Sequence, residues 1–259
     1  MNITDFQMDY FSLKGKNAIV TGGNSGLGQG FATALAKAGA NIFAVSLADD
    51  NGETQKIIED CGVKYKLVLA DITASGECKR VVEECVKTFG SVDILVNCAG
   101  RGINIQDIRK FDKGSWDKIV ALNLSAAYEM THEVIQYMIP QESGKIINIG
   151  SLFTFLGGRW DPAYAATKHA IAGMGKAMCD EVAQWNIQVN TIAPGYFKTK
   201  LTADTRADEK ASQIILDHIP ANRWGDVNDL MGTCVFLASN ASNYVNGTVL
   251  TVDGGYLVR

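Results

Sequence analysis

Residues 17–28 read NAIVTGGNSGLG, and a helical pattern follows at once over residues 27–38. The opening residues form a short apolar run, which is typical of a strand buried on both faces. Gly22, Gly23, Gly26 and Gly28 then follow in the spacing T-G-x-x-x-G-x-G. Glycine allows close backbone approach, and the N-terminus of a helix offers free N–H groups to a phosphate. This strand, turn and helix predict a dinucleotide site. A tight turn with no ligand is the alternative interpretation.

The same alternation of strand and helix patterns continues along the chain. The predicted strands are 17–21, 41–46, 66–70, 93–97, 145–150, 188–192 and 248–252, and the predicted helices are 27–38, 75–89, 116–137, 163–184 and 227–238. Most of the strands are nearly continuous apolar runs, as in a parallel sheet with both faces covered. The pattern predicts an α/β fold with a doubly wound parallel sheet. No linker interrupts it, so we expect a single domain over residues 1–259.

One segment departs from this rhythm. Residues 197–225 carry mixed charge and a helical middle, and they form a long connection between the last two strands. Long connections in compact domains are often functional. We therefore expect a helical lid over residues 197–225, with a surface excursion as the alternative.

Composition excludes several classes of protein. The 24 basic and 28 acidic residues give a net charge of −4, which is unlike a general nucleic-acid binder. No apolar run reaches the length of a membrane span, and the N-terminus lacks the apolar core of a secretory signal. The six cysteines form no C-x-x-C pair and the chain has three histidines, so we expect reduced thiols in a cytoplasmic protein and no metal site.

The end of the second predicted strand bears on the choice of cofactor. Ser46 stands about where an acidic residue binds the ribose in NAD sites, and Ser25 in the glycine turn is also uncharged. No Lys or Arg is present there to take a 2′-phosphate, and Asp49 and Asp50 follow. These residues favour NAD, with NADP as the alternative. Asp71, after the third strand, is a candidate acceptor for the adenine amino group.

A second group of residues has the chemistry of proton transfer. Tyr164 and Lys168 are four residues apart in a helical pattern, so they share one face. An ammonium beside a phenol favours the phenolate and is expected to lower the tyrosine pKa. Ser151 follows a predicted strand and is placed to bind a substrate oxygen. Asn123 is a candidate to hold a water or a helix carbonyl that links Lys168 to solvent.

These motifs together resemble the short-chain dehydrogenase/reductase family. The resemblance rests on the glycine turn, Asn97-Cys98-Ala99-Gly100, Asn123, Ser151, Tyr164-x-x-x-Lys168 and Pro194-Gly195, in that order and over most of the chain. It implies a Rossmann fold with strand order 3-2-1-4-5-6-7 and a tetrad of Asn123, Ser151, Tyr164 and Lys168. Cys98 departs from the asparagine that the family usually has at this position. The cofactor contacts that we expect are Gly22, Asn24, Ser25, Gly26, Leu27, Gly28, Ser46, Asp71, Ile72, Asn97, Ala99, Gly100, Tyr164, Lys168, Pro194, Gly195, Phe197 and Thr199.

Within that family, the chain is similar to the sugar-acid dehydrogenases of uronate breakdown. The similarity lies in FSLKGK at residues 11–16, SGLGQG at 25–30, IPANRWG at 219–225, DLMG at 229–232 and the C-terminal segment 244–259. It implies an anionic substrate such as 2-keto-3-deoxygluconate, 2-deoxygluconate or gluconate, and a homotetramer. Arg101, Arg159, Arg206 and Arg223 are the candidates for binding the substrate carboxylate. A 3-oxoacyl-carrier or steroid/alcohol reductase and a non-catalytic dinucleotide sensor are the alternatives.

Overall fold

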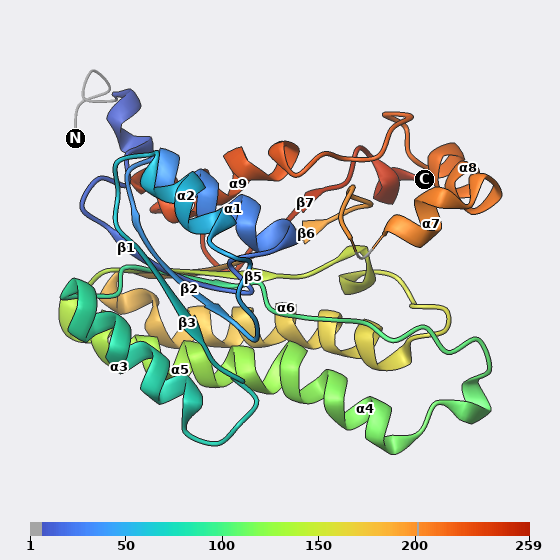
Figure 1. The fold of residues 1–259 in the computed structure, drawn as a ribbon, viewed down its shortest axis with the longest axis horizontal. Coiled ribbons are helices and arrows are strands. Elements are labelled where there is room, and N and C mark those ends of the chain that lie inside the picture. The colour runs from blue at the N-terminus through green and yellow to red at the C-terminus, as the bar shows by residue number, and fades with distance from the viewer. Residues whose placement is uncertain (1–6, 201) are drawn as a thin grey trace.

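A computed structural model describes residues 7–200 and 202–259. Its centre is one sheet of seven parallel strands in the order β3-β2-β1-β4-β5-β6-β7 (Figure 1). The strands are β1 Asn17–Thr21, β2 Asn41–Ser46, β3 Tyr65–Leu69, β4 Ile94–Asn97, β5 Gly144–Ile149, β6 Ile187–Pro194 and β7 Val249–Val252. The fold class and the strand order predicted from the sequence are confirmed.

The apolar runs explain why the central strands lie where they do. Every residue of β1, β4, β5 and β6 is buried, whereas β3 and β7 at the two edges are partly exposed. β1 pairs with β2 on one side, Ala18 opposite Ile42, and with β4 on the other, Ala18 opposite Ile94. β2 and β3 are added on one side of β1, whereas β4 and the later strands are added on the other side, so the strand order reverses between β1 and β4. In open α/β sheets, such a reversal opens a crevice at the carboxyl ends of the strands.

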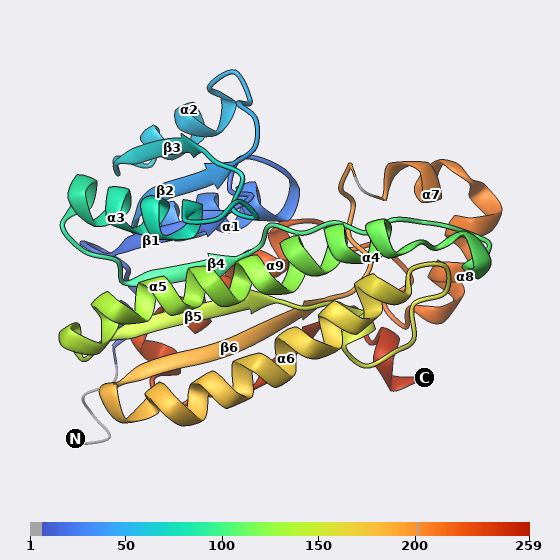
Figure 2. The same cartoon turned by 90° about the horizontal axis from the view of Figure 1, so that it is seen from below.

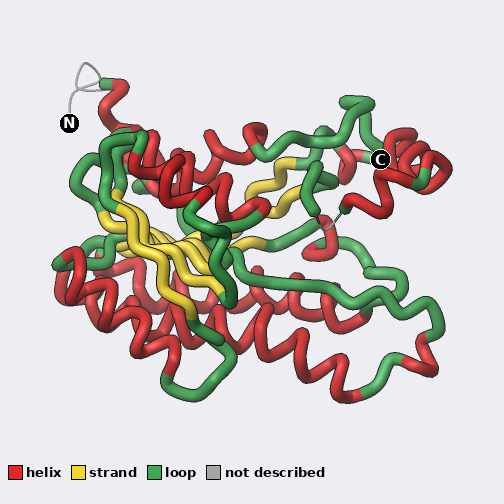
Figure 3. The backbone as a smooth tube through the Cα atoms, viewed as in Figure 1, coloured by secondary structure: helices red, strands yellow, loops and turns green. Residues whose placement is uncertain are grey.

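Helices cover both faces of the sheet. On one face lie α1 Gly26–Lys37, α2 Glu53–Glu59 and α9 Asn228–Ala238, and on the other lie α3 Glu77–Phe89, α5 Ala126–Gln141 and α6 Pro162–Val182 (Figures 1 and 2). Phe31 and Leu230 belong to the core cluster on the α1 and α9 side, and Val82 and Met130 to the cluster opposite. Figure 3 shows the strands as a single layer between these two groups of helices. None of the helices in the described ranges is both long and apolar enough to cross a membrane.

The helix predicted over residues 116–137 has a more specific shape. It consists of α4 Lys113–Val120, one turn of π-helix over Ala121–Ser125, and α5. The wider turn contains Asn123, whose side chain is 2% exposed. Single π-turns are often found at functional sites. The short helix α2, which follows Gly52 at φ 78°, was not predicted.

The segment proposed as a lid contains two helices, α7 Ala203–Ala207 and α8 Glu209–His218. Its two ends are joined, because Lys198 N–H donates to the Gly225 carbonyl and Gly225 N–H donates to the Tyr196 carbonyl, both at 2.9 Å. α7 and α8 lie at one end of the molecule beside the C-terminus (Figure 1). The segment is therefore a closed excursion from the end of β6, and its movement as a lid stays a prediction.

Candidate active site

Two hollows lie at the carboxyl ends of the strands. The inner cavity, of about 340 Å³, is lined by residues that include Ser151, Tyr164, Lys168, Gly195 and Phe197. The outer hollow, of about 650 Å³, is lined by Ser46, Asp71, Ile72 and their neighbours. Gly22 and Ser25 of the glycine turn line both. Volumes of this size suit a small-molecule or cofactor site.

The glycine turn is shaped by steric contact. A Cβ on Gly28 would lie 2.1 Å from the Gly22 carbonyl oxygen, and Gly22 itself has φ +67° and approaches Ala99. Thr21 holds the two loops together, because its hydroxyl accepts hydrogen bonds from the N–H groups of Cys98 and Ala99, both at 3.0 Å. The first turn of α1 carries no acidic residue. Its free N–H groups and dipole are therefore available to a phosphate.

A dinucleotide fits the residues present. The glycine turn leaves backbone N–H groups where a side chain would otherwise stand, and it opens toward both hollows. At the wall of the outer hollow, the buried Ser46 hydroxyl has no hydrogen-bond partner among the described residues. Asn24 also lines this hollow, and its amide donates to the Ala48 carbonyl at 2.6 Å. Gly26, Leu27, Gly28, Pro194, Gly195 and Thr199 line the inner cavity, and Ala99 and Gly100 line both.

Two of the expected cofactor residues have other partners within the protein. Asn97 is buried, and its amide donates to Asn148 Oδ1 at 2.9 Å and to Thr131 Oγ1 at 3.0 Å. Asn97 lines neither hollow, and its buried hydrogen bonds instead fix the end of β4, from which the loop of residues 98–101 begins. Asp71 lines the outer hollow, but one of its carboxylate oxygens already accepts hydrogen bonds from Thr73, which lower the pKa of Asp71.

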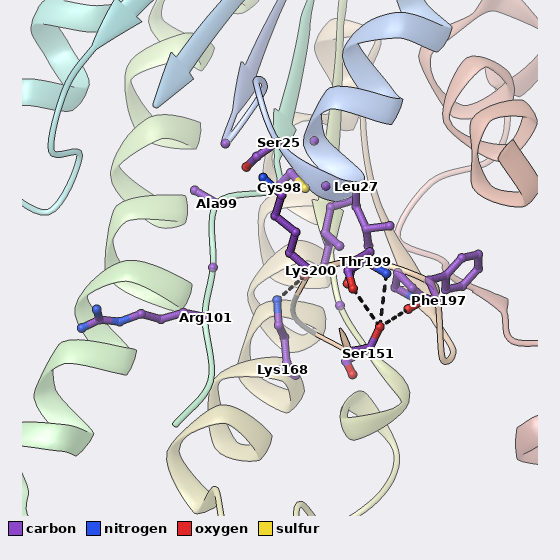
Figure 4. Close-up of a pocket in the computed structure, with 18 of the residues that line it drawn as sticks. Ser25, Leu27, Cys98, Ala99, Arg101, Ser151, Lys168, Phe197, Thr199 and Lys200 are labelled. Atoms are coloured by element: carbon purple, nitrogen blue, oxygen red, sulfur yellow. Dashed lines mark hydrogen bonds between the residues drawn. The ribbon is translucent and has the colours of Figure 1, made fainter. Parts of the chain in front are cut away.

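The inner cavity brings Ser151, Tyr164 and Lys168 together, as the sequence predicts. Figure 4 shows Ser151 and Lys168 among its lining residues. Ser151 follows β5, whereas Tyr164 and Lys168 come from the first turns of α6. The Lys168 ammonium donates to the Ile149 carbonyl at 2.6 Å and lies 5.4 Å from the centre of the Tyr164 ring. Lys168 is 5% exposed, and burial lowers the pKa of its ammonium to about 8.

The pKa of Tyr164 moves in the direction opposite to the one expected from the sequence. Burial raises the pKa of this phenol, the charge of Asp161 raises it further, and the Ser151 hydroxyl lowers it in part. Lys168 directs its ammonium to the Ile149 carbonyl instead. The phenol is therefore protonated at neutral pH, which suits proton donation to a carbonyl oxygen.

Asn123 reaches the site through the backbone of the loop after β4. Its Oδ1 accepts a hydrogen bond from Arg101 N–H, and its Nδ2 donates to the Arg101 carbonyl, both at 2.9 Å. Nδ2 also lies 3.3 Å from Thr167 Oγ1 on α6. The contact with a water or a helix carbonyl that the sequence predicts stays a prediction. Asn123 thus ties this loop to the helix that carries Tyr164 and Lys168.

The four candidate arginines are placed differently from one another. Arg101 lines both hollows, but its side chain points away from Ser151 and Lys168 (Figure 4). The guanidinium of Arg159 stacks on Trp160, 4.8 Å from the ring centre. Arg206 donates to the Thr199 carbonyl at 3.1 Å, and Arg223 forms a two-pronged ion pair with Asp229 at 2.6 and 3.0 Å. Arg159, Arg206 and Arg223 line neither hollow, so the lining does not support their assignment as carboxylate ligands, which stays a prediction.

Sequence reasoning missed five residues that line the inner cavity, which are Cys98, Ile149, Gly150, Lys200 and Thr202. Cys98 was noted only as a departure from the family pattern, and its thiol is neutral because burial raises its pKa to about 12. Lys200 and Thr202 follow the expected Thr199 by one and three residues. The Thr202 hydroxyl donates to the Phe197 carbonyl at 2.6 Å and accepts from Thr199 N–H at 3.2 Å. Lys200 and Thr202 could have been found from the sequence, because they directly follow the predicted cofactor segment.

The fold and this constellation define a dinucleotide-binding oxidoreductase site of the Rossmann type. A family model described as short chain dehydrogenase matches residues 16–210, and the chain belongs to this family. The uncharacterized oxidoreductase YgcW of Escherichia coli (strain K12) is 59% identical over 258 residues, which cover 100% of this chain and 98% of that protein.

Two further relatives carry names that describe an activity. The 2-dehydro-3-deoxy-D-gluconate 5-dehydrogenase of Bacillus subtilis (strain 168) is 45% identical over 97% of this chain and 98% of its own length. A crystal structure of a gluconate 5-dehydrogenase from Burkholderia cenocepacia J2315, in complex with NADP and tartrate, is 35% identical. It superimposes with a TM-score of 0.90 over 97% of this chain and 98% of that one.

Proposed function

We propose that the protein is an NAD(H)-dependent oxidoreductase that interconverts a secondary alcohol and a ketone on a small sugar acid. The substrate pair we propose is 2-keto-3-deoxygluconate and its 2,5-diketo form, in the breakdown of uronates. The observation that carries the proposal is the convergence of Ser151, Tyr164 and Lys168 in a cavity that opens onto the glycine turn. The similarity to the Bacillus subtilis dehydrogenase supports the choice of substrate.

Each side chain then has a chemical task. A bound nicotinamide supplies or accepts the hydride, which is the cofactor's own chemistry. Tyr164 gives its proton to the carbonyl oxygen in the reducing direction, and the Ser151 hydroxyl orients that oxygen by a hydrogen bond. The Lys168 ammonium, anchored on the Ile149 carbonyl, sets a positive charge beneath the reacting groups. Asn123 holds the loop that borders them.

The outer hollow supports NAD as the cofactor. Its lining beside Ser46 includes the carboxylates of Asp49, Asp50 and Glu53. Burial raises the pKa of Asp50, but hydrogen bonds from Thr54 outweigh it and lower the pKa, so this carboxylate stays ionised. A 2′-phosphate would meet negative charge at this end of the hollow. NADH is expected to bind more tightly than NADPH by fluorescence titration. Equal or reversed affinities would refute this part of the proposal.

A gluconate 5-dehydrogenase is the second candidate function, and the relative from Burkholderia cenocepacia favours it. The two candidates differ in the substrate that is reduced. Purified protein is therefore assayed with NADH and NADPH against 2,5-diketo-3-deoxygluconate, 5-ketogluconate and a 3-oxoacyl thioester. We expect the highest kcat/KM with the 3-deoxy diketo acid and NADH. The highest value with 5-ketogluconate would select the second function, and the highest value with the thioester would reject both.

The chemical mechanism has its own test. Tyr164→Phe removes the phenol hydroxyl and leaves the ring in its contact with Phe153, at a centroid distance of 5.8 Å. Turnover is expected to fall at least about 100-fold, which is the low end of general acid catalysis, while NADH binding is retained. Full turnover in this variant would overturn the assigned mechanism, whereas nucleotide binding by the wild type without turnover of any of the substrates would favour a non-catalytic sensor.

We also propose that the chain assembles as a homotetramer. Trp116 on α4 and Tyr128 on α5 are 40% and 49% exposed, and they leave aromatic surface on the helical layer that a second copy could cover. Sedimentation equilibrium tests the assembly, and a monomer at micromolar concentration would contradict it.

A further inference from the structure

The two hollows meet along a shared boundary. Six residues line both: Gly22, Ser25, Ala99, Gly100, Arg101 and Lys200. A dinucleotide that occupies the two hollows with its two nucleosides places its diphosphate at this boundary, because the diphosphate joins the nucleosides. The boundary therefore needs groups that compensate two negative charges.

On one side of the boundary, backbone N–H groups are available to bind a phosphate. The glycine turn and the N-terminus of α1 stand there, and the first turn of that helix carries no acidic residue. The other side is formed by the first residues of the segment after β6, which include Thr199 and Lys200. Lys200 is exposed, and its side chain has no ion pair or hydrogen bond with the described residues.

The direction of the side chain separates Lys200 from Arg101. In Figure 4, Lys200 extends from the segment after β6 toward Cys98 and Ser25, which line the same cavity, whereas Arg101 points away. The charge of Arg101 acts on Asp71, which lies in the outer hollow. Lys200 is thus the cation that reaches the boundary opposite α1.

We propose that Lys200 binds the diphosphate of the dinucleotide and closes the phosphate site from the side opposite the glycine turn. A primary ammonium is a strong, charge-assisted donor to phosphate oxygens. Arg206 supports the arrangement, because it holds the carbonyl of the preceding Thr199 at 3.1 Å. The contact would join the start of the proposed lid to the cofactor through one residue. The inference rests on dinucleotide binding and not on the identity of the sugar acid.

Binding measurements on the whole protein test the proposal without turnover. ADP-ribose contains the diphosphate, adenosine lacks it, and both are titrated calorimetrically into wild type, Lys200→Ala and Lys200→Arg. We expect Lys200→Ala to weaken ADP-ribose and NADH about tenfold, which is typical of the loss of one hydrogen bond to a charged group. Adenosine is expected to bind unchanged, and Lys200→Arg to retain most of the ADP-ribose affinity.

Lys198→Ala is the matched control. Lys198 lies two residues earlier, pairs with Asp226 at 3.1 Å and lines neither hollow, so its removal is expected to leave ADP-ribose affinity unchanged. Unchanged ADP-ribose affinity in Lys200→Ala would overturn the proposal. So would a rise in KM for the sugar acid with unchanged cofactor affinity, which would assign Lys200 to the substrate carboxylate. A much larger loss for NADPH than for NADH would assign it to a 2′-phosphate and would overturn it equally.

Discussion

Lys168→Met is expected to make the cofactor-free protein more stable at neutral pH while it abolishes most of the activity. The ammonium of Lys168 is buried with the Ile149 carbonyl as its hydrogen-bond partner, and burial lowers its pKa from 10.5 to about 8. At about 1.4 kcal/mol for each tenfold change in the ionisation constant, this corresponds to about 3 kcal/mol of unfavourable free energy for the charged form. Methionine removes that charge and keeps a side chain of similar length.

The substitution also has a cost. The Ile149 carbonyl loses its donor, which destabilises the folded state by roughly 1–3 kcal/mol. At pH 7.5 the variant is therefore expected to exceed wild type in stability by up to about 2 kcal/mol. Between about pH 8 and 10.5, the unfolded chain keeps a proton on Lys168 that the folded chain has released, so the stability of wild type rises with pH. The advantage of the variant falls by about 1.4 kcal/mol per pH unit over this window.

Urea unfolding followed by tryptophan fluorescence measures the difference at pH 7.5, 8.5 and 9.5, at one protein concentration. The difference in the free energy of unfolding between variant and wild type cancels the contributions of the other groups that titrate. Lys176→Met, on the exposed side of the same helix, is the control and is expected to stay within about 0.5 kcal/mol of wild type. A variant less stable than wild type at pH 7.5, or a difference that is constant up to pH 9.5, would refute the reasoning. Turnover is expected to fall at least about 100-fold.

Two further substitutions test the glycine turn and the electrostatics of the catalytic phenol. Gly28→Ala places a Cβ 2.1 Å from the Gly22 carbonyl oxygen, so it is expected to lower stability by about 1–3 kcal/mol and to weaken NADH binding. Gly173→Ala in α6 meets no atom within 4 Å and is expected to raise stability by about 0.5–1 kcal/mol, measured by the same urea unfolding. Equal changes in stability in Gly28→Ala and Gly173→Ala would contradict the steric argument. Asp161→Asn keeps an acceptor for Tyr164 N–H but removes a charge that raises the pKa of that phenol. Because reduction needs the protonated phenol, the alkaline limb of kcat/KM is expected to move to lower pH, and no movement would contradict the assigned effect of the charge.

The fold could be predicted because its signals are local and repeated. Each central strand is an apolar run, and each is followed by a helical pattern, so the alternation predicts a parallel sheet with two covered faces. The strand order came from the family resemblance carried by the motifs. The helix α2 was missed because it is short and follows a left-handed Gly52, and neither feature shows as periodicity in the sequence.

The site could be predicted only as far as its motifs extend. The tetrad and the glycine turn have fixed spacings, and the structure brings Ser151, Tyr164 and Lys168 to one cavity. The Asn123 side chain in the π-turn is hydrogen-bonded to the backbone of Arg101, a contact between residues distant in sequence that no local pattern reports. The pKa of Tyr164 depends on burial, which a spacing of four residues does not report.

The arginines show why charge alone was a poor guide to the substrate site. Arg223 is paired with an aspartate and Arg206 with a backbone carbonyl, so both guanidinium groups are already held by the protein, and neither lines the inner cavity. If Lys200 binds the diphosphate, the cations left in the lining of the inner cavity are Lys168, which is held by the Ile149 carbonyl, and Arg101, whose side chain points away from Ser151. Discrimination among sugar acids then depends on the pattern of hydroxyl groups, read by neutral donors such as Ser151. This selectivity is inherently strong, because a buried polar group left without its partner costs more than a lost apolar contact.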